Sequence, residues 1–248
     1  MAQMKTPGVY IIEKNAFPNS VVEVATAIPA FIGHTQFARD GNKDLTGIPF
    51  RISSMAEFHS FFGFAPTLRF GIRPEDSESE DTTNDINVLF PDGSCQLTLP
   101  KTFYALYYNM LLFYANGGGP CYIVSVGDYE HDFKSIDFTN ALLALKKEQE
   151  PTLVVVPEAV YMEEGDCYKV QTAALMHCGN DMKNRFAILD VFNGYKDENG
   201  AVIKSFRENI GSNFLAYCAS YYPWINTSIV TEKDITFYNI EKDSLEKL

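Results

Sequence analysis

The chain has 248 residues and a formal net charge of −12, from 20 Lys and Arg residues against 32 Asp and Glu residues. With 46% hydrophobic and 14% aromatic residues it can bury a substantial core, which excludes intrinsic disorder along most of its length. The acidic balance, without any run of Lys and Arg, excludes a direct nucleic-acid reader and disfavours binding to anionic membranes.

Membrane insertion and secretion are not expected either. The apolar stretch Phe103–Ala115 is too short to span a bilayer, and the first five residues lack the apolar region of a signal peptide. The cysteines are scattered, without a CxxC pair or metal-ligand spacing, so reduced thiols in a cytoplasmic protein are expected. They are Cys95, Cys121, Cys167, Cys178 and Cys218.

The amino-terminal region contains two apolar stretches, Thr6–Glu13 and Val21–Gly33, both rich in β-branched and aromatic residues that favour strands. Turn-forming residues separate them, among them Pro18 and Asn19. A single short strand is not stable alone and must pair with another sheet. We therefore expect residues 1–20 to form a linking arm and residues 21–248 to form the folded body.

An acidic region interrupts this body at about residues 64–100. Between Phe61 and Pro100 there are two basic and seven acidic residues, which contribute −5 to the net charge. Ile86–Phe90 and Cys95–Leu99 flank a turn-like Pro-Asp-Gly-Ser sequence and predict a β-hairpin after a solvated acidic loop. An acidic cation site is the alternative, but the spacing of a calcium-binding loop is absent.

Beyond Pro100 the sequence alternates between helical and extended patterns. Helices are predicted at Lys101–Asn116, Asp137–Gln149, Glu163–Cys178 and Phe206–Ile210, and strands at Cys121–Val126, Thr152–Pro157, Arg185–Phe192 and Phe214–Ile225. In the second helix the leucines expected to face inward are Leu142, Leu143 and Leu145. This alternation predicts an α/β fold: a mixed, largely parallel sheet flanked by helices, with an extended N-terminal β arm and an inserted acidic loop plus β-hairpin.

The residue types that carry chemistry do not assemble into a recognisable site in the sequence. Gly117–Gly119 follows a predicted helix and precedes a strand, the reverse of a phosphate-binding loop, so it is interpreted as a helix terminator. The neighbours His177 and Cys178 point about 100° apart on a helix and do not form a nucleophile pair. Asp190, at the end of a predicted strand, is the best acid–base candidate, with a loop-capping role as the alternative. We therefore expect no enzyme activity, no cofactor and no metal site.

Four segments, in this order, resemble the tail sheath proteins of contractile phage tails and related contractile injection systems. They are Thr6–Glu13 (TPGVYIIE), Val24–Gly33 (VATAIPAFIG), Asn116–Val124 (NGGGPCYIV) and Ala219–Ile225 (ASYYPWI). The most specific are Pro-Gly-Val-Tyr near the amino terminus and Tyr-Tyr-Pro-Trp after the α/β region.

This resemblance implies a structural protein that stacks as hexameric rings around an inner tube and contracts to drive the tube through a target envelope. Neighbouring subunits would be joined by strand addition. The linking arm would comprise Thr6, Pro7, Gly8, Val9, Tyr10, Ile11, Ile12 and Glu13. The partners implied are further copies of the chain, the inner tube protein, and baseplate and terminator proteins. The implied location is the cytoplasm of the producing bacterium, in an assembled particle.

Two regions need separate comment, the aromatic segment at residues 221–224 and the carboxyl-terminal region. Aromatic clusters usually bury area, so core packing or subunit contact is expected for Tyr221, Tyr222, Pro223 and Trp224, with ligand binding as the alternative. Sheath proteins continue into a tube-facing carboxyl-terminal part, for which the sequence up to Leu248 has no counterpart. The chain is therefore expected to be a fragment, part of a longer protein, or a shortened sheath-like subunit.

The alternative function is a small α/β ligand-binding domain or enzyme with its site at the strand carboxyl ends.

Overall fold

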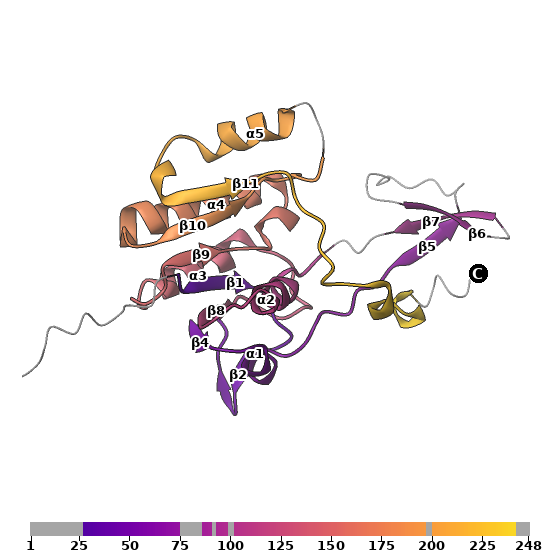
Figure 1. The fold of residues 1–248 in the computed structure, drawn as a ribbon, viewed down its shortest axis with the longest axis horizontal. Coiled ribbons are helices and arrows are strands. Elements are labelled where there is room, and N and C mark those ends of the chain that lie inside the picture. The colour runs from indigo at the N-terminus through magenta and orange to yellow at the C-terminus, as the bar shows by residue number, and fades with distance from the viewer. Residues whose placement is uncertain (1–26, 75–85, 91–92, 99–101, 197–199, 242–248) are drawn as a thin grey trace, which may run out of the picture.

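The computed structural model describes residues 27–74, 86–90, 93–98, 102–196 and 200–241 (Figure 1). Its centre is a six-stranded sheet in the order β11-β10-β9-β1-β8-β4, with helices on both faces. All neighbouring strands run parallel except β4, which is antiparallel to β8. The prediction of an α/β fold with a largely parallel sheet is confirmed.

The strands of this sheet are β1 (Pro29–Gly33), β4 (Phe50–Ile52), β8 (Cys121–Ser125), β9 (Leu153–Val155), β10 (Phe186–Asp190) and β11 (Cys218–Tyr221). The helices are α1 (Met55–Phe62), α2 (Leu106–Ala115), α3 (Ser135–Leu145), α4 (Glu164–Met176) and α5 (Ala201–Ile210). A π-helical turn, His177–Met182, extends α4. Short 3-10 helices lie at Ala159–Tyr161, Leu215–Tyr217, Glu232–Asp234 and Phe237–Asn239.

The path of the chain through the sheet changes direction once. From the central strand β1 the chain reaches the edge strand β4 and then β8, both on one side of β1. It then passes through α3 to β9 on the other side of β1, and continues outward to β10 and β11. Phe31 therefore lies beside both Ile123 of β8 and Val155 of β9. The loops after β1 and β9 leave the sheet at this point of reversal, where open α/β sheets commonly place their ligands.

Two hydrophobic cores, one on each face, hold the sheet. The first contains Ala30 and Ile32 of β1 together with residues of α3 and α4, among them Phe138 and Leu175. The second contains Phe31 of the same strand and residues of α1 and α2. Successive residues of β1 thus point to opposite faces and are buried on both, as a central parallel strand requires.

The structure corrects several details of the predicted helices; helix α5, for example, begins at Ala201 rather than at Phe206. Helix α2 begins at Leu106 rather than Lys101, and its first turn receives no hydrogen bond from a local capping side chain. Leu143 is 52% exposed, whereas Leu142 and Leu145 are buried. Adjacent helical residues differ by about 100° in direction, so Leu143 points away from the face that Leu142 shares with the core.

The predicted hairpin is confirmed and belongs to a larger unit. Strands β6 (Ile86–Phe90) and β7 (Gly93–Thr98) pair antiparallel, with Phe90 opposite Gly93, so the second strand starts before the predicted Cys95. A third strand, β5 (Gly71–Pro74), pairs with β7. Figure 1 shows this three-stranded sheet apart from the main sheet. The predicted acidic loop at residues 75–85 and the arm at residues 1–20 lie outside the described residues.

Besides β5 and the short helical turns, three elements were not predicted from the sequence. Strand β4 and helix α1 extend the sheet and cover its second face, with Phe58 and Phe62 fully buried. Ser54 caps α1 by accepting a hydrogen bond from the Glu57 backbone at 3.2 Å, which is a regular amino-terminal signal. The third is a short hairpin of β2 (Arg39–Asp40) and β3 (Lys43–Asp44). In the described ranges no helix is long and apolar enough to cross a membrane.

Candidate functional site at the carboxyl end of the sheet

The point of reversal between β1 and β9 is filled by two buried, hydrogen-bonded side chains, His34 and Glu158. Glu158 follows β9 and is fully buried, and His34 follows β1 and is 1% exposed. Glu158 Oε2 accepts a hydrogen bond from the His34 backbone N–H at 2.9 Å and lies 2.8 Å from His34 Nδ1. Burial raises the pKa of the Glu158 carboxyl, an effect that its hydrogen bonds with His34 oppose.

The second oxygen of Glu158 connects this pair to α2. Oε1 accepts a hydrogen bond from the Leu106 backbone N–H at 3.3 Å, and so caps the helix that has no local cap. A carboxylate at a helix amino terminus also interacts favourably with the helix dipole. The single side chain of Glu158 therefore joins the ends of β1 and β9 to the start of α2.

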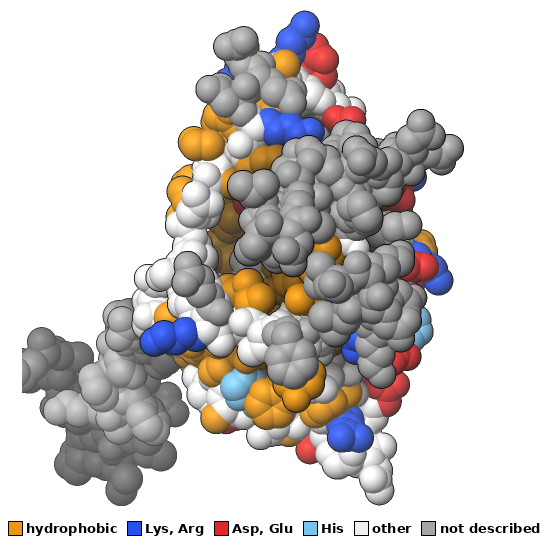
Figure 2. Space-filling view, turned by 90° about the vertical axis from the view of Figure 1, so that its right-hand side faces the viewer, with side chains coloured by type: hydrophobic (Ala, Val, Ile, Leu, Met, Phe, Trp, Pro, Cys, Tyr) orange, Lys and Arg blue, Asp and Glu red, His pale blue; other side chains and the backbone are white. Residues whose placement is uncertain are grey.

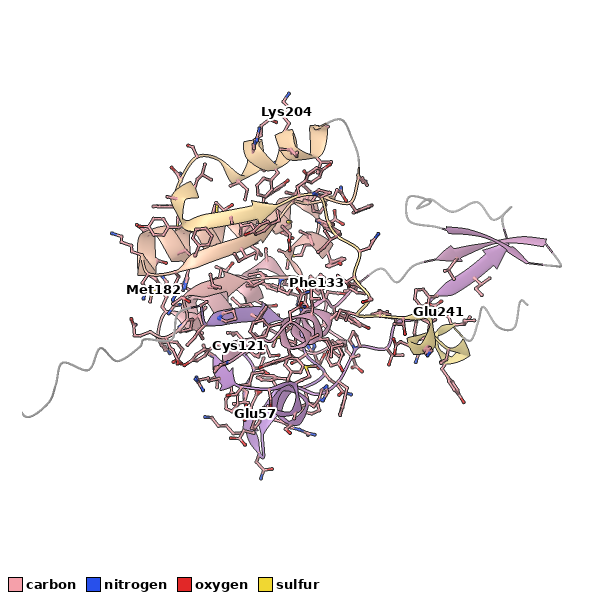
Figure 3. The ribbon with its side chains drawn as sticks, in the orientation of Figure 1. Glu57, Cys121, Phe133, Met182, Lys204 and Glu241 are labelled. Carbon is pink, nitrogen blue, oxygen red and sulfur yellow. The ribbon has the colours of Figure 1, made fainter. Side chains whose placement is uncertain are left out.

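Aromatic side chains and a tightly packed glycine surround the pair. The His34 ring lies against the rings of Tyr104, Phe133 and Phe138, with centroids 5.0 to 5.7 Å apart. Figure 3 labels Phe133 within this crowded region at the end of the sheet. A Cβ added at Gly33 would lie 2.9 Å from Leu106 Cβ and 3.0 Å from Glu158 Cδ, so the position requires glycine. The crevice is thus occupied by the chain's own side chains.

An open groove lies beside this filled crevice. It has a cavity volume of about 710 Å³ and runs between α2, the loops after β9 and β10, and an extended segment at Tyr222–Val230, which we call the strap. Its aromatic and acidic lining comprises Phe103, Tyr108, Tyr161, Asp190, Tyr221, Tyr222 and Trp224. Figure 2 shows a hollow with hydrophobic side chains at its base on this side of the molecule.

Trp224 attaches the strap to the body. Its backbone N–H donates to the Gly194 carbonyl at 3.0 Å, and its indole Nε1–H donates to the Val191 carbonyl at 3.0 Å. A Cβ at Gly194 would lie 2.5 Å from Trp224 Nε1, so only glycine permits this approach. The indole ring packs near the rings of Tyr161 and Tyr195, at 6.1 and 5.3 Å between centroids.

The aromatic segment predicted as core or subunit contact divides into two kinds of residue. Trp224 is half-buried against the loop after β10, as described above. Tyr221, Tyr222 and Pro223 are exposed, so the interpretation as core residues is wrong for these three. They lie at the edge strand β11 and just beyond it, where the core is already covered. Subunit contact stays a prediction for them.

As predicted, Asp190 lies at the carboxyl end of a strand, β10, and it lines the groove. Burial raises the pKa of its carboxyl above the ordinary value. The Asp190 carbonyl accepts a hydrogen bond from Gln171 Nε2 at 2.7 Å, which fixes the strand end against α4. Within the described part of the chain, no group of three or more His, Cys, Asp and Glu side chains is placed to hold a metal.

The other residues considered for chemistry have structural environments. His177 is buried and its Nε2 accepts a hydrogen bond from the Arg185 guanidinium at 2.8 Å. Burial and the positive charge of Arg185 lower the pKa of His177 to about 4, so the ring is neutral at pH 7. Burial raises the pKa of the Cys178 thiol to about 12, which leaves it unreactive. Gly117 ends α2 with a positive φ of 83°, as a helix terminator does.

The pair His34–Glu158 was missed by sequence reasoning because its members are 124 positions apart. Each follows an apolar strand, and knowledge of the strand order would have brought them together.

No model of a known protein family matches the chain, and no curated protein sequence matches it significantly.

Proposed function

We propose that the chain is a structural subunit of a contractile tail sheath, which polymerises as stacked rings around an inner tube. The observation that carries this proposal is a row of exposed apolar side chains on the segment that follows the edge strand β11. We call this row the ribbon; its residues are Tyr221, Tyr222, Ile225, Val230 and Ile235, of which the first four also line the groove.

The ribbon has the composition of an assembly surface. Ile225 is 80% exposed and Tyr221 is 67% exposed, although both are large and apolar. Single exposed apolar residues are ordinary, but a row of them with aromatic members is typical of a surface that a partner protein covers. Its position beyond the edge strand of the main sheet suits a contact between neighbouring subunits in a wall.

The segment that carries the ribbon also connects the two sheets of the subunit. Beyond the strap, the Asn239 carbonyl accepts a hydrogen bond from the Phe70 backbone at 2.7 Å, and the Glu241 backbone donates to the Phe70 carbonyl at 2.9 Å. Figure 3 labels Glu241 beside the three-stranded sheet. A contact made by the ribbon would therefore act on both sheets of the subunit, as a mechanical assembly requires.

Strand addition supplies the link between subunits in this proposal. The main sheet has edge strands at β11 and β4, to which an extended segment of another copy can add. Residues Thr6–Glu13 would reach about 26 Å at ~3.3 Å per residue, enough to cross to a neighbour. Contraction would release free energy stored in the extended assembly, so the subunit needs no nucleotide. The further partners proposed are the inner tube, baseplate and terminator proteins.

The filled point of reversal favours this role over the alternative of a small ligand-binding domain or enzyme. In that alternative the ligand would lie at the carboxyl ends of the strands, and the usual place for it is the crevice at the point of reversal, beyond β1 and β9. Here Glu158 and His34 occupy it and connect three elements of the chain. The arrangement favours rigidity of the body, which suits a subunit that transmits force.

Replacing Ile225 by aspartate is expected to reduce the number of assembled tubes at least tenfold, because a charge would be buried in a subunit contact. The folded body should keep its stability, since the side chain is exposed in the subunit. Tubes would be counted by negative-stain electron microscopy of the producing cells' lysate, and stability by thermal unfolding of the purified chain.

The matched control is Ile136→Asp, which introduces the same charge at a 58% exposed isoleucine on α3. Normal tube numbers for Ile136→Asp together with a loss for Ile225→Asp would support the ribbon as a subunit contact. Equal tube numbers for both variants and the unaltered chain would contradict it.

A further inference from the structure

Aromatic rings form a continuous wall along one side of the groove. The Phe103 ring stacks on Tyr108 at 5.5 Å and contacts Tyr161 at 4.9 Å between centroids. Tyr161 in turn lies 6.1 Å from Trp224. The faces of such rings carry negative electrostatic potential and attract cations that approach within about 6 Å.

A carboxylate lies in the same groove. Asp190 reaches it from the carboxyl end of β10, and among the described residues no Lys or Arg forms an ion pair with it. The pKa of Tyr161 is raised to about 12, mainly by burial and further by the negative charges of Asp190 and Glu158. The groove thus places a carboxylate beside the aromatic wall, an arrangement that favours a positively charged group.

The remaining lining is mostly aliphatic, with Asn109 and Thr227 as polar members. Leu112 of α2, Val160 after β9, and Val230 of the strap face the same space. The cavity volume of about 710 Å³ is within the range of small-molecule sites. A ligand that matches this lining has a cationic head for the acid and the rings, and a short apolar chain for the aliphatic side.

We propose that the groove binds an alkylammonium group, with its cation between Asp190 and the rings of Tyr161 and Trp224. An anion would be repelled by the carboxylate, and a neutral ligand would remove water from it without replacing the lost interactions. A free alkylamine and a lysine side chain of another protein share this chemistry. The inference goes beyond the proposed sheath function and does not depend on it.

Trp224 provides a direct reporter, because it is the single tryptophan of the chain. The purified chain would be titrated with hexyltrimethylammonium, and with hexanol as a neutral probe of equal chain length, while tryptophan emission is recorded. We expect a saturable change with a Kd about tenfold or more lower for the cation than for hexanol, which corresponds to about 1.4 kcal/mol.

The role of the carboxylate is tested with Asp190→Asn, which is expected to remove most of the preference for the cation over hexanol. Glu208→Gln, on the exposed side of α5, removes the same charge away from the groove and should keep the preference. Tyr161→Leu removes one ring and is expected to weaken binding of the cation. If circular dichroism shows that Asp190→Asn does not fold, the Tyr161→Leu variant still tests the site.

The source of the ammonium group is distinguished by a third probe, N-acetyl-lysine methylamide. Binding as tight as that of hexyltrimethylammonium would indicate a lysine side chain of a partner, whereas binding of the alkylammonium alone would indicate a small molecule; both support the site. Equal Kd values for the cation and hexanol, an unchanged tryptophan emission, or unaltered preference in Asp190→Asn would overturn it. None of these outcomes depends on tube assembly.

Discussion

Replacing Glu158 by alanine is expected to lower the free energy of unfolding of the body by about 3–5 kcal/mol. The substitution removes the acceptor of the backbone N–H groups of His34 and Leu106 and the partner of the His34 ring, all of them buried. Unpaired buried donors are costly, and a cavity is left among three elements. Urea denaturation at pH 7, followed by circular dichroism, measures the loss.

Two further substitutions of glutamate distinguish the loss of this hydrogen-bond network from the general effect of removing a glutamate side chain. Glu158→Gln retains one acceptor oxygen and the volume, so its loss of stability should lie between those of alanine and the unaltered chain. Glu163→Ala removes an exposed glutamate at the start of α4 and should change the free energy of unfolding by less than about 0.5 kcal/mol. A cost for Glu158→Ala below about 1 kcal/mol would show that the buried pair does not hold the crevice closed.

Deleting Met1–Glu13 is expected to abolish tube assembly while the body still folds. The main sheet begins at Pro29, so its strands and both cores are retained in the deleted chain. In the proposed function the deleted residues supply the strand that joins neighbouring subunits, and no other segment would replace it. The test combines thermal unfolding of the purified chain with electron microscopy of lysates.

A chain in which Thr6–Glu13 is replaced by a Gly-Ser sequence of equal length controls for the loss of chain length. It should also fail to assemble, because a Gly-Ser sequence has low preference for strand pairing. Tubes formed by either variant would show that Thr6–Glu13 does not join neighbouring subunits. Loss of folding in the deleted chain would show that these residues belong to the body.

Local pattern was enough to predict most elements of the fold. The apolar strand at Thr152–Pro157 contains β9, and the glycines after Asn116 end α2 as expected. Errors occurred where the deciding contact is remote. The start of α2 depends on Glu158, which follows a strand much later in the chain, so the local sequence around Lys101 carried no signal for it.

The candidate site was predictable only in part for the same reason. Asp190 and Trp224 were selected from their sequence context, because one ends a strand and the other belongs to an aromatic motif. Their meeting in one groove depends on β10 and β11 being neighbours and on the strap crossing the strand ends. The position of Gly194 under Trp224 gave no signal in the sequence, since its backbone φ requires no glycine and only the packed indole does.

The sheath proposal is tested most directly by immunogold electron microscopy of particles from the producing cells, with an antibody to this chain. The account predicts striated tubes labelled along their whole length, because a sheath subunit is repeated in every ring. Label at one end of the tubes would instead indicate a baseplate or terminator protein. Label confined to small soluble material, with no tubes, would contradict the structural role and favour the ligand-binding alternative.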